Sequence, residues 1–215
     1  MMKRIHIFCE GDTEESFVRE IMYDHFISKN ILLNPIIVRT SAKETGGITT
    51  YGKIKNQIIR KCHQDKQAIV TTFIDFYALP RDFPGQDKKL SGISSYEKAV
   101  FFEEEFAKDI NLKNFLPNLT IHEFEGLLFS NPEVFIKYFD KSISKKISKI
   151  RKAYETPEYI NDDPKTAPSK RLIKICPHYQ KISHGTLISY DIGLEAIRKE
   201  CRHFNQWLEK LEKMS

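Results

Sequence analysis

The sequence feature that most constrains the fold is a near-continuous apolar run at Ala68–Ile74, which reads AIVTTFI. Charged and polar residues precede this run, and Asp75 follows it directly. A strand that is apolar on both of its faces is typical of the centre of a parallel sheet, because helices cover both sides of such a sheet. We therefore expect Ala68–Ile74 to be a central strand that places Asp75 at its carboxyl end.

Strands and helices are expected to alternate on both sides of this segment. The other predicted strands are Ile5–Phe8, Ile31–Val38 and Leu119–Phe124, and the predicted helices are 13–28, 48–63, 94–110 and, with a break at Asn131–Pro132, 125–139. Alternation of this kind predicts an α/β fold with a mostly parallel sheet flanked by helices. Pro35 favours an edge position for the second strand, because proline cannot donate a ladder hydrogen bond.

The composition changes after Phe139. Lys141–Lys152 has the pattern of a basic helix with isoleucines on one side, and further helices are expected at Pro168–Ile175 and Leu194–Met214. The stretches 155–169 and 179–185 are expected to be loops, and no strand is predicted in this part. We therefore expect two units: an α/β domain over residues 1–139 and a helical C-terminal extension over residues 140–215 that packs on it.

The composition fits a folded protein with a substantial core. The chain has 215 residues, of which 40% are hydrophobic and 29% are charged. No apolar run is long enough to span a bilayer, and no hydrophobic signal region follows the basic start Met1–Arg4, so a cytoplasmic protein without a membrane partner is expected. The four cysteines are widely scattered, which favours reduced buried thiols over disulfides or a zinc site.

Carboxylates follow three of the four predicted strands. Glu10 follows the first strand, Asp75 the third, and Glu123 and Glu125 lie at the end of the fourth. The carboxyl ends of parallel strands share one edge of a sheet, which is where such folds bind ligands. Clustered carboxylates repel one another unless a cation lies between them, and ligands that are all oxygen suit Mg²⁺ or Mn²⁺. The alternative is that these acids occupy polar turns without a ligand.

The segment Glu10–Glu15 resembles the opening glutamate-glycine motif of the Toprim domain, which topoisomerases, primases and several nucleases share. Asp75 stands where those families carry the first aspartate of an Asp-x-Asp pair. More closely, the chain resembles a bacterial family of Toprim-like proteins of unassigned function, often encoded beside ATPases in defence loci. The motifs that carry this resemblance are Glu10–Glu15, Asp75–Pro80, His122–Glu125, Asn161–Arg171, Tyr179–Gly185 and Gly193–Trp207.

The resemblance implies that Glu10 and Asp75 serve a metal site, which Glu123 or Glu125 would complete. Glu10 would be a metal ligand or a general acid/base, and Asp75 the first metal-binding aspartate. The chain departs from the Toprim pattern at Tyr77, which replaces the second aspartate of the pair. This departure puts a second metal in doubt, and Asp82, Glu123 and Glu125 are the acids that could substitute.

Basic residues in the two C-terminal loops are candidates for holding phosphate. Lysine and arginine bind phosphate through charge and forked hydrogen bonds, and histidine can relay protons near neutral pH. The predicted phosphate-binding residues are Lys165, Lys170, Arg171 and Lys181; the predicted catalytic residues are Glu10, Asp75, Lys170, Lys181 and His184, and His178 is a second candidate proton relay. Each of these basic residues is alternatively a surface charge.

Two helices have basic faces that are best explained as solvated. Lys53, Lys55, Arg60 and Lys61 lie on one face of the helix predicted at 48–63, and Lys141–Lys152 forms the other basic helix. The helix at Lys141–Lys152 could alternatively contact a nucleic-acid backbone through charge. The net charge of +5 permits a phosphate-rich partner without requiring one, and no base-reading motif is present.

The function expected first is a Mg²⁺-dependent nuclease that acts on nucleic acid, with DNA the expected substrate and, by resemblance, an ATPase as partner. The alternative is a non-catalytic subunit that docks on a partner or binds nucleic acid, which the tyrosine at position 77 favours. A small-molecule phosphotransferase ranks last, because the chain has no GxxxxGK[ST] phosphate loop. Homo-oligomer formation is left open.

Overall fold

The computed structural model describes residues 2–39, 50–77, 79–161 and 166–213. Within these residues the strands form one parallel sheet in the order β2-β1-β3-β4, with β5 paired to β3 beyond the end of β4. The strands are β1 Lys3–Cys9, β2 Ile31–Ile37, β3 Ile69–Asp75, β4 Phe115–Leu116 and β5 Leu119–Thr120. The predicted parallel α/β sheet, the edge position of the second strand and the central position of the third are confirmed.

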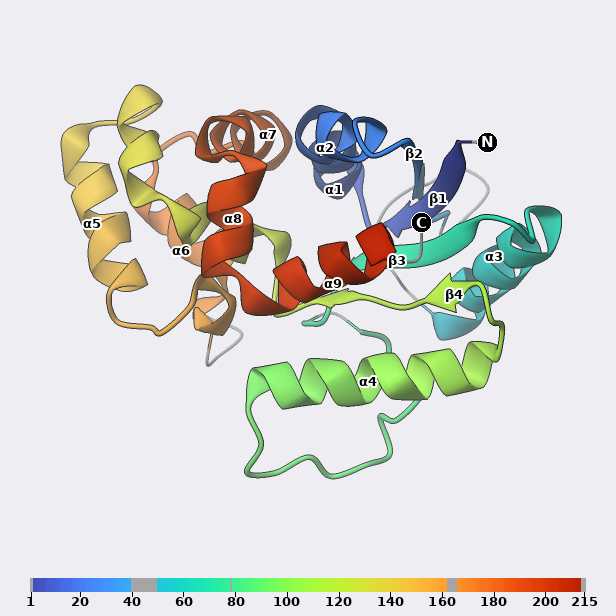
Figure 1. Cartoon of the computed structure of the whole chain (residues 1–215). Coiled ribbons are helices and arrows are strands. Elements are labelled where there is room, and N and C mark those ends of the chain that lie inside the picture. The colour runs from blue at the N-terminus through green and yellow to red at the C-terminus, as the bar shows by residue number, and fades with distance from the viewer. Residues whose placement is uncertain (1, 40–49, 78, 162–165, 214–215) are drawn as a thin grey trace.

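Helices cover both faces of this sheet (Figure 1). The α-helices are α1 Asp12–Phe17, α2 Tyr23–Ile27, α3 Tyr51–Gln64, α4 Ser95–Ile110, α5 Lys141–Arg151, α6 Pro168–Ile175, α7 Lys181–Ile192, α8 Leu194–Glu200 and α9 Arg202–Lys213. A π-helical turn, η1 Val18–Met22, joins α1 to α2, and the 3₁₀ segments are η2 Phe124–Ser130, η3 Pro132–Lys137 and η4 Pro157–Tyr159. No described helix has the length and apolarity needed to cross a bilayer.

Three local predictions differ from the structure. The strand expected at Leu119–Phe124 is only the two-residue β5, because the chain turns at His122, which has a left-handed φ of 66°. The segment after it is 3₁₀-helical in two pieces, where an α-helix was expected. The loop expected at 179–185 is mostly the first turns of α7, so several residues assigned to a loop lie on a helix.

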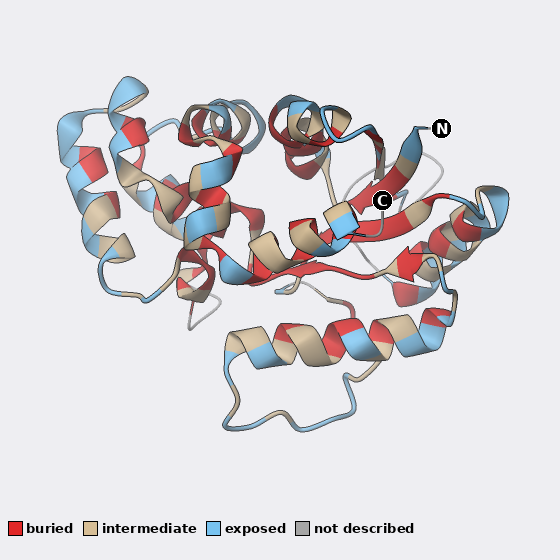
Figure 2. Cartoon of the chain, in the orientation of Figure 1, coloured by how far each residue is buried: buried red, intermediate tan, exposed pale blue. Residues whose placement is uncertain are grey.

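The residues of each strand alternate between two buried clusters on opposite faces of the sheet. Ile5, Ile7 and Cys9 of β1 belong to a cluster with α1, α2 and the C-terminal helices, whereas Phe8 belongs to one with α3 and α4. The strands are accordingly buried along most of their length (Figure 2). All four cysteines are buried and free, as expected from their spacing.

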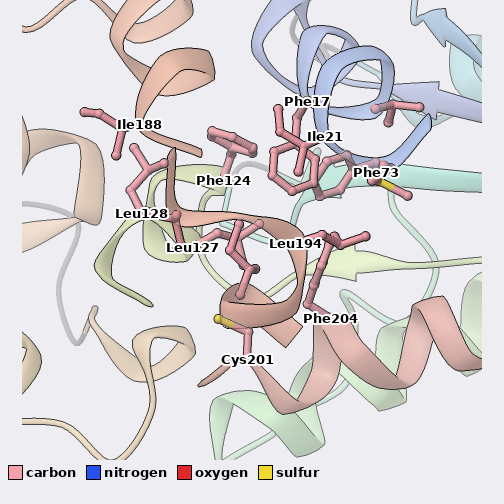
Figure 3. Packing of buried hydrophobic residues seen from close by; sticks show 14 of the residues in the cluster. Phe17, Ile21, Phe73, Phe124, Leu127, Leu128, Ile188, Leu194, Cys201 and Phe204 are labelled. Carbon is pink, nitrogen blue, oxygen red and sulfur yellow. The ribbon is translucent and has the colours of Figure 1, made fainter. Parts of the chain in front are cut away.

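The larger cluster joins the N-terminal and C-terminal halves of the chain. Phe17 from α1, Phe73 from β3 and Phe124 from η2 meet Phe204 from α9, with ring centroids 5.4 to 6.2 Å apart in the closest pairs (Figure 3). The predicted C-terminal helical region is therefore confirmed and shares this core. The domain boundary at residues 139 and 140 stays a prediction.

Candidate functional site

The carboxylates of Glu10 and Asp75 are linked to one another and to η2 by a short series of hydrogen bonds. Glu10 follows β1, and its Oε2 accepts the backbone N–H of Asp75 at 3.0 Å. Asp75 ends β3, and its Oδ1 accepts the backbone N–H of Phe124 at 2.9 Å. These bonds form because β1 and β3 are adjacent parallel strands that end at the same level. The sheet therefore brings together the two acids that the sequence analysis ranked first.

Two further carboxylates are oriented at helix N-termini. Glu123 Oε2 accepts the N–H of Ser169 in the first turn of α6, at 2.9 Å. Glu14 Oε2 accepts the N–H of Gly11, the N-cap residue of α1, at 3.0 Å. Glu14 was not among the predicted site residues, although the spacing of a capping box, with an acid three residues after the N-cap, is the signal that could have found it.

Glu125 differs from these four acids because no backbone N–H holds it. Its side chain is fully buried, and neither carboxylate oxygen accepts a hydrogen bond within the described residues. Lys181 Nζ, at the start of α7, lies 3.1 Å from Glu125 Oε1, so the contact is an ion pair outside hydrogen-bond geometry. A buried carboxylate that accepts no hydrogen bond is rare in proteins, and the charge of Glu125 is balanced by the ammonium of Lys181.

Burial and the charge of neighbouring carboxylates raise the pKa values of Glu10, Glu14, Asp75 and Glu125. Burial raises the pKa of Glu14 to about 7 and that of Glu125 to about 6, with nearby carboxylates adding to both shifts. The pKa of Asp75 is raised well above its ordinary value by burial first and then by Glu14, Glu10 and Glu125. Each of these four acids therefore feels the charge of at least one other carboxylate, as expected at a shared rim.

Lys181 is the cation that acts on this group. Burial opposes its ammonium charge, but Glu125, Asp75 and Glu123 outweigh that effect and raise the pKa of Lys181. Burial is the largest influence on Glu10 and raises its pKa, and Lys181 offsets part of that rise. We call Glu10, Glu14, Asp75, Glu123, Glu125 and Lys181 the acidic rim.

A family model described as a domain of unknown function, DUF4276, matches residues 9–212 of the chain. The chain belongs to the DUF4276 family. No curated protein and no solved structure matches it. The matched segment of the DUF4276 chain includes every residue of the acidic rim. Membership of a family of unassigned function is thus confirmed, while the likeness to Toprim enzymes and to defence loci stays a prediction.

The basic residues predicted to hold phosphate are only partly at the acidic rim. Lys181 is there, whereas Lys170 is exposed on α6. Arg171 donates to the carbonyl of Thr166 at 2.6 Å and to the hydroxyl of Tyr154 at 3.0 Å, which commits its guanidinium to the local fold. Lys165 lies outside the described residues.

His184 has a structural environment on α7. Its Nδ1 accepts the backbone N–H of Gln180 at 2.9 Å, just before the helix begins. Its ring stacks on Tyr179 with centroids 5.9 Å apart and lies 5.1 Å from the ring of Phe139. These contacts involve no acid of the rim, so the structure does not bring His184 to the carboxylates; its predicted catalytic role stays a prediction.

The other acid considered as a replacement for the second Toprim aspartate lies elsewhere. Both carboxylate oxygens of Asp82 accept the N–H of Tyr51 at 3.0 Å, so Asp82 caps the first turn of α3. The side chain of Tyr77 is 38% exposed. Glu14, Glu123 and Glu125 are therefore the acids that accompany Glu10 and Asp75.

The position of Lys181 depends on close packing of α7 against α1 at Gly185. A Cβ atom at Gly185 would lie 3.2 Å from Thr13 Cγ2 and 3.6 Å from the Tyr179 hydroxyl oxygen. Contacts of 3.2 Å are tighter than ordinary van der Waals packing, and overpacking costs about 1–3 kcal/mol. The small residue is therefore what allows α7 to reach the rim.

We expect Gly185→Val to destabilise the protein by about 2 kcal/mol, because the branched side chain would push α7 away from Thr13. Urea denaturation followed by circular dichroism measures the change. Gly52→Ala is the matched control, since a Cβ at Gly52, in the first turn of α3, meets nothing within 4 Å. That control should leave stability equal or slightly higher; equal losses in both variants would contradict the packing argument.

The donor chemistry of the rim suits a hard divalent cation that is bound by few protein ligands. All of its acids offer oxygen, and Glu125 has two buried oxygens without hydrogen bonds. Among the described residues, no three His, Cys, Asp or Glu side chains are grouped so as to hold a metal ion. This is compatible with Mg²⁺, which is usually bound through one or two carboxylates together with water and substrate phosphate.

Proposed function

We propose that this DUF4276 protein is a Mg²⁺- or Mn²⁺-dependent nuclease that hydrolyses phosphodiester bonds at the acidic rim. The observation that carries the proposal is Glu125, a fully buried carboxylate without hydrogen bonds in the midst of acids with raised pKa values. Lys181 supplies one positive charge beside several carboxylates, so a divalent cation would lower their remaining repulsion, and metal-assisted hydrolysis is the reaction that clustered oxygen ligands serve best. The absence of a membrane-spanning helix in the described chain supports the proposal that it works in the cytoplasm.

In the proposed reaction, the residues of the rim have three roles: holding the ion, balancing charge and transferring a proton. Asp75 and Glu125, with Glu10 and Glu123 beside them, would hold the ion, which when bound supplies Lewis-acid activation of water and phosphate. Lys181 balances negative charge next to these acids and can steady a phosphate oxygen. Glu14, with a pKa of about 7, can take up or release a proton at neutral pH, which is the property of a general acid or base.

The test combines a binding measurement with an activity measurement. Mn²⁺ titrated calorimetrically at pH 8 should bind the wild-type protein, and affinity should fall at least tenfold in Asp75→Asn and Glu125→Gln. Binding should be weaker at pH 5, because protons compete for the same carboxylates. Glu133→Gln is the control, since Glu133 is an exposed acid on η3.

Cleavage of circular and linear DNA with Mg²⁺ or Mn²⁺ is then compared across the same proteins. We expect cleavage by the wild type and by Glu133→Gln, and none by the two rim variants. Cleavage by both rim variants, or a Mn²⁺ affinity that neither substitution changes, would refute the proposed site. Metal binding at the rim without cleavage, even with the neighbouring ATPase added, would favour a non-catalytic role.

A partner-docking subunit is the second candidate function, and a separate observation favours it. The outer face of α7 carries Ile182, Leu187 and Tyr190, which are 50%, 50% and 66% exposed. Large apolar side chains gathered on one exposed helix are typical of a protein interface. The proposed partner is the ATPase that the family resemblance implies. Loss of ATPase binding in Leu187→Ser and Tyr190→Ser, with metal binding unchanged, would identify this role.

A further inference from the structure

A groove on the outer side of the sheet is lined by cations and has no role in the acidic rim. It lies between α3 and the edge strand β2 and has a volume of about 680 Å³. Among the described residues, its charged lining residues are Arg39, Lys53, Arg60 and Lys61, and none of them is an acid. Four positive charges around one open groove select a polyanion. The basic face of α3, expected from the sequence to be solvated, borders this groove over most of its length.

The fold separates the groove cations from the other lysine of the same helix. Lys55 Nζ pairs with Asp109 Oδ2 of α4 at 2.8 Å, on the side of α3 that faces the core. Arg60 and Lys61 form no salt bridge within the described residues, so their charges remain available. Within the described residues, Arg60 and Lys61 thus lack the acidic partner that Lys55 has.

Hydrogen bonds fix the shape of the groove at the end where Arg39 follows β2. The backbone N–H of Arg39 donates to Gln57 Oε1 at 3.1 Å, and Gln57 Nε2 donates back to the carbonyl of Arg39 at 3.0 Å. These bonds tie the end of β2 to the middle of α3. Asn56 and Gln64 add amide groups to the lining, which can donate to phosphate or sugar oxygens.

The groove opens at the same edge of the sheet as the acidic rim. The backbone N–H of Val38 donates to the carbonyl of Cys9 at 2.9 Å, so Arg39 and Glu10 leave neighbouring strands at the same level. From there the lining follows α3 from Lys53 to Gln64, a length of about 16 Å at the helical rise of 1.5 Å per residue. That length spans several phosphates of a nucleic-acid strand.

We propose that this groove binds the sugar–phosphate backbone of a nucleic-acid strand. The lining has cations and amides, and its aromatic residue Phe8 is only 2% exposed, so the contacts are to backbone and without base stacking. An added protein strand fits less well, because Pro35 within the edge strand has no N–H to donate and the lining carries four like charges. Use of the groove as the path to the rim rests on the proposed nuclease function, whereas binding itself does not.

Binding is measured by fluorescence anisotropy with fluorescein-labelled single-stranded and duplex DNA, in EDTA so that no cleavage occurs. The triple variant Lys53→Gln/Arg60→Gln/Lys61→Gln should bind at least tenfold more weakly at 0.1 M salt. The slope of log affinity against log salt should fall by about 2–3 for duplex DNA, because each removed phosphate contact contributes about 0.9. Glu133→Gln, at an exposed acid outside the rim, should bind as tightly as wild type. Because binding is measured without metal, its result is independent of whether the nuclease proposal fails.

The matched control removes the same charge from the other basic helix. Lys145, Lys146 and Lys149 are exposed on α5, and their triple change to Gln should alter affinity less than twofold. Arg39→Gln, which lies outside any helix, gives a second groove variant if the triple variant folds poorly, and should weaken binding about threefold or more. Equal losses in the α5 and groove variants, or unchanged binding in both groove variants, would overturn the proposal.

Discussion

Glu14→Gln is expected to stabilise the metal-free protein at pH 8 by about 3 kcal/mol. Burial raises the pKa of Glu14 from 4.5 to about 7, so the folded protein must bury a charge at pH 8 that the unfolded chain carries in water. Each unit of such a shift corresponds to about 1.4 kcal/mol. A neutral amide removes this cost, and its oxygen can still accept the N–H of Gly11.

The sign of the pH dependence follows from the direction of the shift. Between pH 4.5 and 7 the folded protein holds a proton on Glu14 that the unfolded chain has released, so wild-type stability from this group is lost as pH rises through that window. Wild type and Glu14→Gln should therefore differ by under about 1 kcal/mol at pH 5, and most at pH 8.

Urea denaturation in EDTA at both pH values measures this difference. The exposed acid Glu133 provides the control Glu133→Gln, which should change stability by no more than about 0.5 kcal/mol at either pH. If Glu14→Gln were destabilising at pH 8, the carboxylate of Glu14 would stabilise the fold through its hydrogen bond. Burial of its charge in the acidic rim would then not carry the expected cost.

Trp207→Ala is expected to have the largest effect on folding, a loss of about 3–5 kcal/mol. The indole of Trp207 in α9 is 2% exposed, and its Nε1–H donates to Thr71 Oγ1 on the central strand β3 at 2.9 Å. Its ring lies 5.3 Å from that of Phe73 and 5.8 Å from that of Phe204. Removing it leaves a cavity against the centre of the sheet and takes the bonded partner from Thr71.

Circular dichroism during thermal and urea denaturation is the appropriate measurement, because Trp207 is the sole tryptophan and its fluorescence disappears with it. Trp207→Phe should lose less stability, because it keeps an aromatic ring and mainly loses the hydrogen bond to Thr71.

A chain that ends at residue 139 should fail to fold cooperatively, because it lacks the C-terminal side chains of the shared core. Cooperative folding of that fragment would contradict the shared core.

Much of the fold was predictable from the sequence because short-range patterns determine it. The apolar run before Asp75 identified the central strand, and Pro35 identified the edge strand; both are confirmed. The strand-end positions of Glu10 and Asp75 followed directly, because parallel strands end at one edge. The local errors occurred where a turn or cap decides the structure, as at His122 with its left-handed backbone.

The sequence by itself determined the parallel α/β architecture and the acids at the carboxyl ends of β1 and β3. Only the tertiary structure decided which other side chains join them: Glu14 through its cap on α1, Glu125 through burial, and Lys181 through the packing of α7. Tertiary contacts also committed Arg171 and His184 to local hydrogen bonds. The physical reason is that charge and residue type are local properties, whereas a side chain's partner depends on packing between segments far apart in the chain.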